Sequence, residues 1–208
     1  ALLSGDLTFA NTEHLQAVLK VYGGNDIAVL VRQQIDNPKL PIKQQQALFA
    51  LLAQTGNTND AQLVLKSANT LPDVLRTLSE SVQKHNLQPP PNAEKQLSTA
   101  IRNRNELVRA EAIQLAGLWK INSFKHYILT EATDQNEPAN VRLAATKALG
   151  QLGGDKAIAS LYRLAVLTEP APVRAAAISG LAKLDLPNAA KLSAELLTKV
   201  NEIELGTI

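Results

Sequence analysis

The stretch NVRLAATKALGQL, residues 140–152, decides the fold of this 208-residue chain, because the chain repeats it. PVRAAAISGLAKL at 172–184 and LVRAEAIQLAGLW at 107–119 share its apolar residue, its arginine and the small or apolar residues that follow at helical spacing. The arginines are Arg109, Arg142 and Arg174, at intervals of 33 and 32 residues. Self-similarity at a period of about 20 to 50 residues is typical of repeat architectures.

The same register extends towards the N-terminus. Steps of similar length reach Arg76 in LPDVLRTL and Lys43 in LPIKQQQAL. An apolar residue precedes each basic position. Prolines lie two or four residues before four of the five, all but Arg109, and they suit a first helical turn, where a missing N–H is not needed. The five aligned basic residues are Lys43, Arg76, Arg109, Arg142 and Arg174.

Between these helices, each unit holds a second apolar-periodic segment that opens on Asp, Asn or Ser. These side chains accept hydrogen bonds from free N–H groups at a helix start. The segments open near residues 26, 59, 92, 122, 155 and 188. The sequence therefore predicts an all-α fold, a right-handed α-solenoid of about six antiparallel helix pairs with a period of 32–33 residues. PPPN at 89–92 lengthens one connection, so we expect a local irregularity there.

Composition excludes several classes of site and partner. Cysteine is absent, which excludes disulfides, thiolate metal sites and cysteine nucleophiles. Lys and Arg number 21 against 19 Asp and Glu, and without the clustered basic excess of nucleic-acid binders we expect no nucleic-acid partner. No apolar run is long enough for a membrane span. Methionine is also absent, so we expect residues 1–208 to be a single array cut from a larger multidomain protein.

The string VRLAATKALG at 141–150 has the form V-R-x-x-A-x-x-A-L-G and resembles the signature of HEAT repeats, in particular the short variety also found in phycobilin lyases. The resemblance covers most of the chain and implies a scaffold, because such arrays are only occasionally enzymes. The run VRAAAISGLAKLDLPNAAKLSAELL is similar to helical arrays in large exported proteins of planctomycete-type bacteria, between a sugar-dehydrogenase-like propeller and a cytochrome c domain. That resemblance implies a bacterial extracytoplasmic (periplasmic) location and an oxidoreductase parent.

The five basic residues are interpreted as a structural ladder. A catalytic group is usually unique, whereas this position recurs in five units. A cation in the first turn opposes the helix dipole, so its partners should lie outside its own helix. The corresponding arginine of HEAT-like arrays bonds to carbonyls or acidic groups of the adjoining loop and repeat, and we expect the same contacts across the seams here. The functional alternative is a row of solvent-facing arginines that binds an anionic ligand.

The second helices usually line the concave face of such solenoids, where a partner would bind. Counting eleven residues back from each basic position gives a column that includes Leu65 and Ser98, and Trp119 lies near a basic and aromatic group. The candidate contacts of this face are Arg32, Lys125, His126, Tyr127, Glu131 and Arg163. Burial of Trp119 and Tyr127 between repeats is the simpler interpretation of the two aromatic residues.

Catalytic and metal sites find little support in the sequence. The three histidines are scattered, and no GK[ST] follows the glycines at 153–154, which are better explained as a helix exit. Carboxylates near helix ends, such as Glu137 and Glu169, are interpreted as solvated turn residues. We therefore expect no metal and no cofactor.

The predicted function is a non-catalytic scaffold or protein-interaction module that contacts a protein partner or adjacent domains of its own chain. One alternative is an enzyme or accessory lyase that binds a small ligand in the concave face. Its pocket would be lined by His126, Tyr127, Glu131 and Arg163. A further alternative, nucleic-acid binding, is disfavoured by the balanced charge.

Overall fold

The computed structural model describes residues 24–35, 41–55, 57–166 and 168–197. The chain forms two compact units, unit 1 with Ala1–Gln96 and unit 2 with Leu97–Ile208. All regular secondary structure in these described ranges is helical, with no strand among them, which confirms the predicted all-α class. None of the helices in the same ranges is long and apolar enough to cross a membrane.

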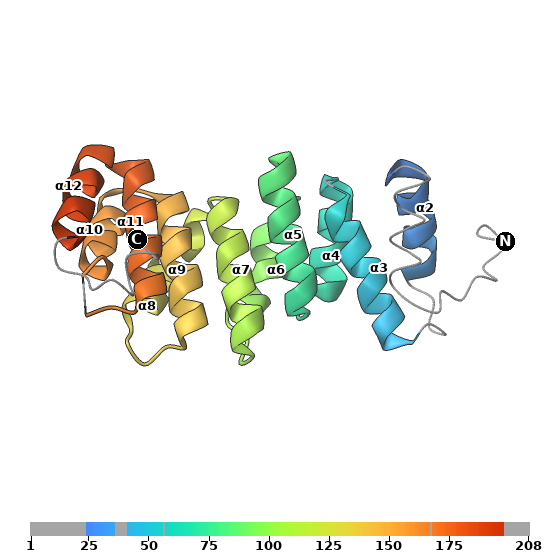
Figure 1. Ribbon diagram of the computed structural model, residues 1–208. Coiled ribbons are helices and arrows are strands. Elements are labelled where there is room, and N and C mark those ends of the chain that lie inside the picture. The colour runs from blue at the N-terminus through green and yellow to red at the C-terminus, as the bar shows by residue number, and fades with distance from the viewer. Residues whose placement is uncertain (1–23, 36–40, 56, 167, 198–208) are drawn as a thin grey trace. The chain divides into compact units, whose positions relative to one another are not determined.

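The helices alternate between first helices, which carry the repeated basic position, and second helices (Figure 1). The first helices are α3 (Ile42–Gln54), α5 (Pro72–His85), α7 (Glu106–Leu118), α9 (Ala139–Leu152) and α11 (Ala171–Leu184). The second helices are α2 (Gly24–Ile35), α4 (Thr58–Ala68), α6 (Ala93–Ala100), α8 (Lys125–Thr133), α10 (Asp155–Leu164) and α12 (Leu186–Leu197), and the short 3₁₀ helix η1 (Asn122–Phe124) leads into α8. Each corresponds to a predicted segment, and the first helix of the first pair lies outside the described residues.

Polar side chains and prolines fix the helix starts. The Asn57 side chain accepts a hydrogen bond from the N–H of Asn59 at the start of α4. Pro138 and Pro170 stand directly before α9 and α11, with φ of −52° and −56°. These prolines fix the entry angle of the chain and cost no helical hydrogen bond.

Two connections explain where helices end. Gly153 and Gly154 follow α9 with φ of 65° and 84°, conformations that favour glycine, and this confirms the predicted helix exit. Asn86 ends α5 with φ of 50°, and Asn92 before α6 has φ of 62°. Between them the chain is not helical around the prolines at 89–91, which confirms the predicted irregularity.

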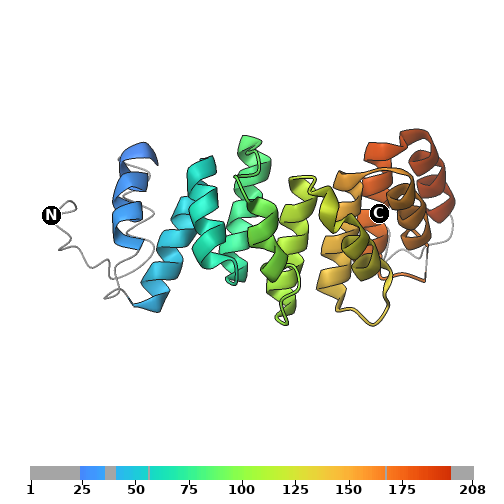
Figure 2. The same ribbon diagram turned by 180° about the vertical axis from the view of Figure 1, so that it is seen from behind.

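Unit 2 has two layers of helices. In one layer α7 packs against α9 and α9 packs against α11, while α8 packs against α9 and α10 packs against both α9 and α11. The two second helices α8 and α10 also contact each other. Figure 2 shows this unit from behind, with α8 in front of α9.

Glycines allow the first helices of unit 2 to approach closely. A Cβ built on Gly117 of α7 would lie 2.6 Å from the Cα of Ala148, and one on Gly150 of α9 would lie 2.7 Å from the Cα of Gly180. A larger residue at either position would push two backbones apart, because helix interfaces are packed as densely as protein cores. The small residues of the repeated stretch therefore set the spacing of the layer.

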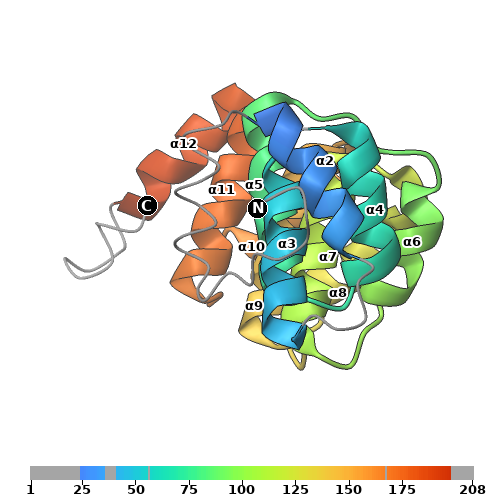
Figure 3. The same cartoon turned by 90° about the vertical axis from the view of Figure 1, so that its right-hand side faces the viewer.

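Unit 1 uses the same pairing. Helix α3 contacts α2 and α5, and α4 contacts both α3 and α5. In Figure 3, α4 lies to one side of α3 and α5, which form the other layer. One predicted apolar position departs from the pattern, because Ile42 at the start of α3 is 74% exposed. The four equivalent residues are buried, and they are Leu75, Val108, Val141 and Val173.

Candidate functional site

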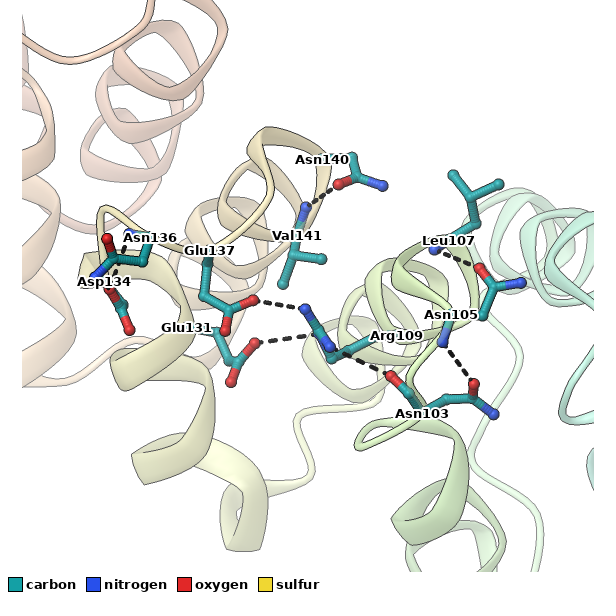
Figure 4. Close-up of polar contacts among 10 residues, drawn as sticks. All are labelled: Asn103, Asn105, Leu107, Arg109, Glu131, Asp134, Asn136, Glu137, Asn140 and Val141. Atoms are coloured by element: carbon teal, nitrogen blue, oxygen red, sulfur yellow. Dashed lines mark hydrogen bonds and ion pairs between the residues drawn. The ribbon is translucent and has the colours of Figure 1, made fainter.

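Arg109 on α7 connects two repeats of unit 2 through its guanidinium (Figure 4). Its Nη2 donates to Glu137 Oε2 at 2.6 Å, and its Nε lies 3.4 Å from Glu131 Oε2. Its Nη1 donates to the carbonyl of Asn103 at 3.3 Å. Glu137 precedes α9, whereas Asn103 precedes α7 and Glu131 belongs to α8. The side chain therefore joins its own repeat to the next one.

Two short polar turns hold the partners of Arg109 in place. Asn103 accepts a hydrogen bond from the N–H of Asn105 at 2.9 Å, and Asn105 in turn accepts one from the N–H of Leu107 at 3.0 Å and caps α7. Asp134 accepts from the N–H of Asn136 at 2.9 Å in the loop that carries the glutamate. Asn and Asp favour such turns because their side chains bond to the backbone two residues later.

Glu131 is a carboxyl group at a core position. It is 7% exposed, and the equivalent positions of the neighbouring second helices hold Ala100 and Leu164. Burial raises the pKa of Glu131 and the nearby Glu137 raises it further, whereas the Tyr127 hydroxyl and Arg109 oppose the rise. Burying a carboxylate without a charged partner is costly in free energy, and the ion pair with Arg109 offsets that cost for Glu131.

Tyr127 joins the same cluster from the first turn of α8. The guanidinium carbon of Arg102 lies 5.6 Å from the centre of its ring, within the range of a cation–π contact. Burial and the neighbouring Glu131 raise the pKa of Tyr127 above its usual value. The phenol stays protonated at neutral pH, as tyrosine ordinarily does. Trp119 is buried, as predicted, and Tyr127 is partly buried.

Glu169 links the arginines of two successive repeats. Arg142 Nη2 donates to Glu169 Oε2 at 2.6 Å, and Arg174 Nη1 donates to the backbone carbonyl of Glu169 at 3.1 Å. Both arginines are buried, and Arg174 is only 1% exposed. Buried guanidinium groups need acceptors of this kind, and hydrogen bonds with one charged partner are stronger than neutral ones. The turn before α11 supplies them to both repeats.

Two glutamates of this network belong to one motif that the sequence analysis did not use. Glu137 and Glu169 each begin the string E-P-A-x-V-R, and each pairs with the arginine 28 or 27 residues earlier. Their interpretation as solvated turn residues is wrong, because the side chains are 24% and 11% exposed and engaged by arginine. The repeated motif is the sequence signal that identifies them.

The two N-terminal members of the predicted ladder lie in different surroundings. Arg76 is exposed and pairs with Asp73 on its own helix, and Lys43 is exposed as well. Both side chains thus differ in exposure from the three arginines of unit 2. The buried arrangement is found in unit 2, in Arg109, Arg142 and Arg174.

Arg32, a predicted surface contact, has a structural partner in unit 1. Its Nε and Nη2 donate to the two carboxylate oxygens of Asp60 on α4 at 2.6 and 2.9 Å. Asp60 is buried and also accepts a hydrogen bond from the Thr55 hydroxyl at 2.9 Å. The hydrogen bond to Asp60 raises the pKa of Arg32. This pair ties α2 to α4.

The remaining predicted contacts divide by burial. His126 and Arg163 are exposed, Lys125 is partly buried, and Glu131 is buried and unavailable to a partner. Counting eleven residues back from the basic position also placed Leu65 on the partner-binding face, and Leu65 is fully buried. The fixed count fails because the loops differ in length. As a result, the intervals between successive second helices differ from the intervals between successive first helices. Aligned by their buried residues, Glu131 matches Leu164, and Thr130 matches Arg163.

The exposed side chains of α8, α10 and α12 recur at helical spacing. We name this set the second-helix surface. It consists of His126, Thr130, Lys156, Ala159, Arg163 and Lys191. Glu195 is exposed on the same side of α12, and Asp155 is exposed in the first turn of α10. The surface thus carries three permanent cations on two successive second helices.

No group of three or more metal-ligating side chains is found in the described part of the chain. The structure does not bring the four residues of the predicted ligand pocket to one exposed site, because Glu131 is in the core whereas His126 and Arg163 are exposed. The buried arginines have carboxylate or carbonyl acceptors inside the array. Their arrangement is that of a structural network between repeats.

Comparison with known families agrees with the paired helices and the repeated arginine. The sequence profile of HEAT repeats matches residues 93–182 and 126–202, which together cover more than half of the chain. The chain belongs to the HEAT-repeat family. HEAT repeats generally mediate contacts between proteins. No curated protein matches the sequence significantly. The match confirms the resemblance to HEAT repeats that the V-R-x-x-A-x-x-A-L-G string indicated.

Proposed function

We propose that this HEAT-repeat chain is a non-catalytic protein-interaction module, and that its second-helix surface binds an acidic protein partner. The observation that carries the proposal is the exposure of Lys156, Arg163 and Lys191 on successive second helices. The buried arginines of the first helices are engaged within the array, so on this surface the three exposed residues are the cations that a partner would meet.

The network between repeats prepares this surface for binding. Close contacts at Gly117 and Gly150 and the Arg142–Glu169 pair fix each helix pair against the next. A surface that is rigid before binding loses less entropy when the partner docks. Complementary charge then raises the association rate and excludes partners of the wrong sign.

The other candidate functions gain no specific support. Three cations on two helices, none of them on α8 and without stacking aromatic residues among them, do not make the continuous basic stripe that single-stranded nucleic acids require. An enzyme or lyase pocket would need Glu131 at the surface, and it is buried beside Arg109.

The partner that we favour is an adjoining domain of a longer protein. The resemblance of residues 173–197 to the arrays of exported dehydrogenase and cytochrome c proteins supports this proposal and implies an extracytoplasmic oxidoreductase parent. The full-length parent sequence tests it. A propeller upstream and a c-type haem motif downstream are expected, and an isolated array would contradict this part of the proposal alone.

Charge reversal tests the second-helix surface. The double variant Lys156→Glu, Arg163→Glu is expected to lose a partner that the unmodified chain retains in a pull-down, and titration calorimetry with the purified partner measures the loss. Lys147→Glu is the matched control, because Lys147 is an exposed lysine on a first helix. Equal retention by the double variant and the control would exclude this surface. Retention that falls steeply with salt on immobilised DNA would favour the nucleic-acid alternative.

A further inference from the structure

The seam between α7 and α9 carries one carboxyl group more than the next seam of unit 2. Arg109 Nη2 donates to Glu137 Oε2 at 2.6 Å, and its Nε lies 3.4 Å from Glu131 Oε2. At the next seam the equivalent arginine donates to Glu169, and the apolar Leu164 stands at the position of Glu131. One guanidinium charge therefore meets two carboxyl groups at the first seam and one at the second.

The second carboxyl group of the α7–α9 seam is poorly compensated as an anion. Glu131 and Glu137 approach the Arg109 guanidinium from the same side (Figure 4). Glu131 Oε2 is buried and accepts no hydrogen bond from the described part of the chain, and its 3.4 Å separation from Arg109 Nε is longer than an ordinary hydrogen bond. A buried acceptor without a hydrogen bond costs free energy, and an ionised one costs more.

The surroundings of Glu131 favour a bound proton. The charged and titratable groups that face it are Arg109 on α7, Tyr127 on its own helix and Glu137 before α9, and Arg102 lies over the ring of Tyr127. Burial raises the pKa of Glu131 and Glu137 raises it further, while the Tyr127 hydroxyl and Arg109 oppose the rise. Two carboxyl groups at one site do not both ionise readily, because each ionised group disfavours the charge on the other.

We propose that Glu131 and Glu137 hold one proton between them in the pH range in which exposed glutamates are ionised, and that loss of this proton loosens the packing of α8 on α9. With the proton bound, the two glutamates and Arg109 carry no net charge, like the arginine–glutamate pair of the next seam. Without it, the site carries a net negative charge. This inference goes beyond the proposed function, because it concerns the interior network and not the surface that a partner meets.

The direction of the pH effect follows from the state that binds the proton more tightly. In the unfolded chain the two glutamates ionise independently, whereas the folded chain keeps the shared proton to higher pH. The stability that this proton contributes is therefore present below the unfolded titration range, and it is lost as pH rises through the folded one. Local opening of α8, which packs against α9, becomes easier as pH rises.

Carbon-13 NMR of the glutamate side chains tests the shared proton in the full 208-residue chain. The Glu131 carboxyl is expected to titrate above the ordinary range of glutamate, and Glu137→Gln should lower its titration midpoint because it removes the neighbouring charge. Asp134→Asn is the matched control. It removes an exposed carboxylate from the same loop and keeps an oxygen that can accept from the N–H of Asn136.

The control is expected to leave the midpoint of Glu131 unchanged. A midpoint of Glu131 within the ordinary range in the unmodified chain would overturn the proposal. An unchanged midpoint in Glu137→Gln would also overturn it, and so would equal shifts in Glu137→Gln and Asp134→Asn, because these would show a general effect of charge in the loop.

Hydrogen exchange of the unmodified chain tests the effect on packing and needs no variant. After correction for intrinsic exchange, the protection of the α8 amides is expected to fall about tenfold as Glu131 titrates, which corresponds to about 1.4 kcal/mol. The amides of α10 are the internal control, because Leu164 occupies the equivalent position there. Constant protection of α8, or an equal fall in both helices, would overturn the proposal. Both experiments use the chain alone, so their failure is distinct from a failure of the second-helix surface to bind a partner.

Discussion

Arg142 and Glu169 form a 2.6 Å hydrogen-bonded ion pair across the seam between α9 and α11, and both side chains are nearly inaccessible to solvent. The same Glu169 accepts from Arg174 through its backbone carbonyl. One residue in the turn thus fixes two first helices. This explains why an arginine can stand in a first helical turn against the helix dipole, since its partners lie outside its own helix.

We predict that Arg142→Ala lowers the free energy of unfolding by about 3 to 5 kcal/mol, because it leaves the Glu169 carboxylate buried without its partner. Arg76→Ala is the control. Arg76 is exposed and pairs with exposed Asp73 on its own helix, so its loss is expected to cost about 0 to 1 kcal/mol. Urea unfolding of both variants measures the difference. Partner binding per folded molecule should be unchanged in Arg142→Ala, and its loss at unchanged stability would assign Arg142 to a binding site.

Gly150→Ala is predicted to destabilise unit 2 although alanine is the better helix former. Its propensity favours the variant by about 1 kcal/mol. The new Cβ would lie 2.7 Å from the backbone Cα of Gly180, which cannot move without shifting α11. Overpacking typically costs about 1 to 3 kcal/mol, so the clash should prevail. The exposed Ser179→Ala on α11 provides the reference for propensity alone. A melting temperature of Gly150→Ala at or above that of the unmodified chain would contradict the close contact.

The sequence was sufficient for the helices because each helix carries its own local signals. Prolines before α9 and α11, apolar periodicity and the glycines after α9 act within a few residues, so the eleven α-helices of the described ranges could be predicted one at a time. The buried arginines could be predicted for unit 2 by their repetition. The exposure of Lys43 and Arg76 could not, because a basic residue in register looks the same whether or not the next helix covers it.

The candidate surface was harder to predict because it depends on loop lengths. Counting a fixed interval placed Glu131 in one column with Arg163, whereas the structure aligns Glu131 with Leu164. An error of one residue turns a helical side chain by about 100° and moves it from the surface to the core. The acceptors Glu137 and Glu169 were recognisable in principle, since both begin an E-P-A-x-V-R string, but the string alone does not show which arginine they meet.

Asp60→Asn is predicted to destabilise unit 1 by about 1 to 3 kcal/mol, the range for hydrogen bonds that involve a charged group. The buried carboxylate of Asp60 accepts two hydrogen bonds from Arg32 and one from Thr55, and an amide supplies only one acceptor oxygen. Asp73→Asn is the control, because its exposed pair with Arg76 contributes little. Denaturant unfolding measures both variants, and an equal, small loss for the two would show that the Arg32–Asp60 pair is no stronger than a surface pair.

The buried carboxyl of Glu131 predicts a pH-dependent gain in stability for Glu131→Gln. Burial raises the pKa of Glu131 in the folded chain, so the folded state binds its proton more tightly than the unfolded state does. Stability contributed by this group is therefore present below its unfolded pKa and is lost as pH rises through the folded pKa. Glutamine cannot ionise and avoids that loss.

The difference in unfolding free energy between Glu131→Gln and the unmodified chain is therefore expected to grow in favour of the variant as pH rises from about 4 to about 8. Urea unfolding at several pH values measures it, with Thr130→Ala on the exposed side of α8 as a variant that changes no ionisable group. The variant Glu131→Leu introduces the residue that α10 has at the equivalent position. It should gain more stability than Glu131→Gln only if the hydrogen bonds of Arg109 to Glu137 and to the Asn103 carbonyl are sufficient without Glu131. A gain for glutamine that shrinks with rising pH would mean that the Arg109 charge outweighs burial and keeps Glu131 ionised.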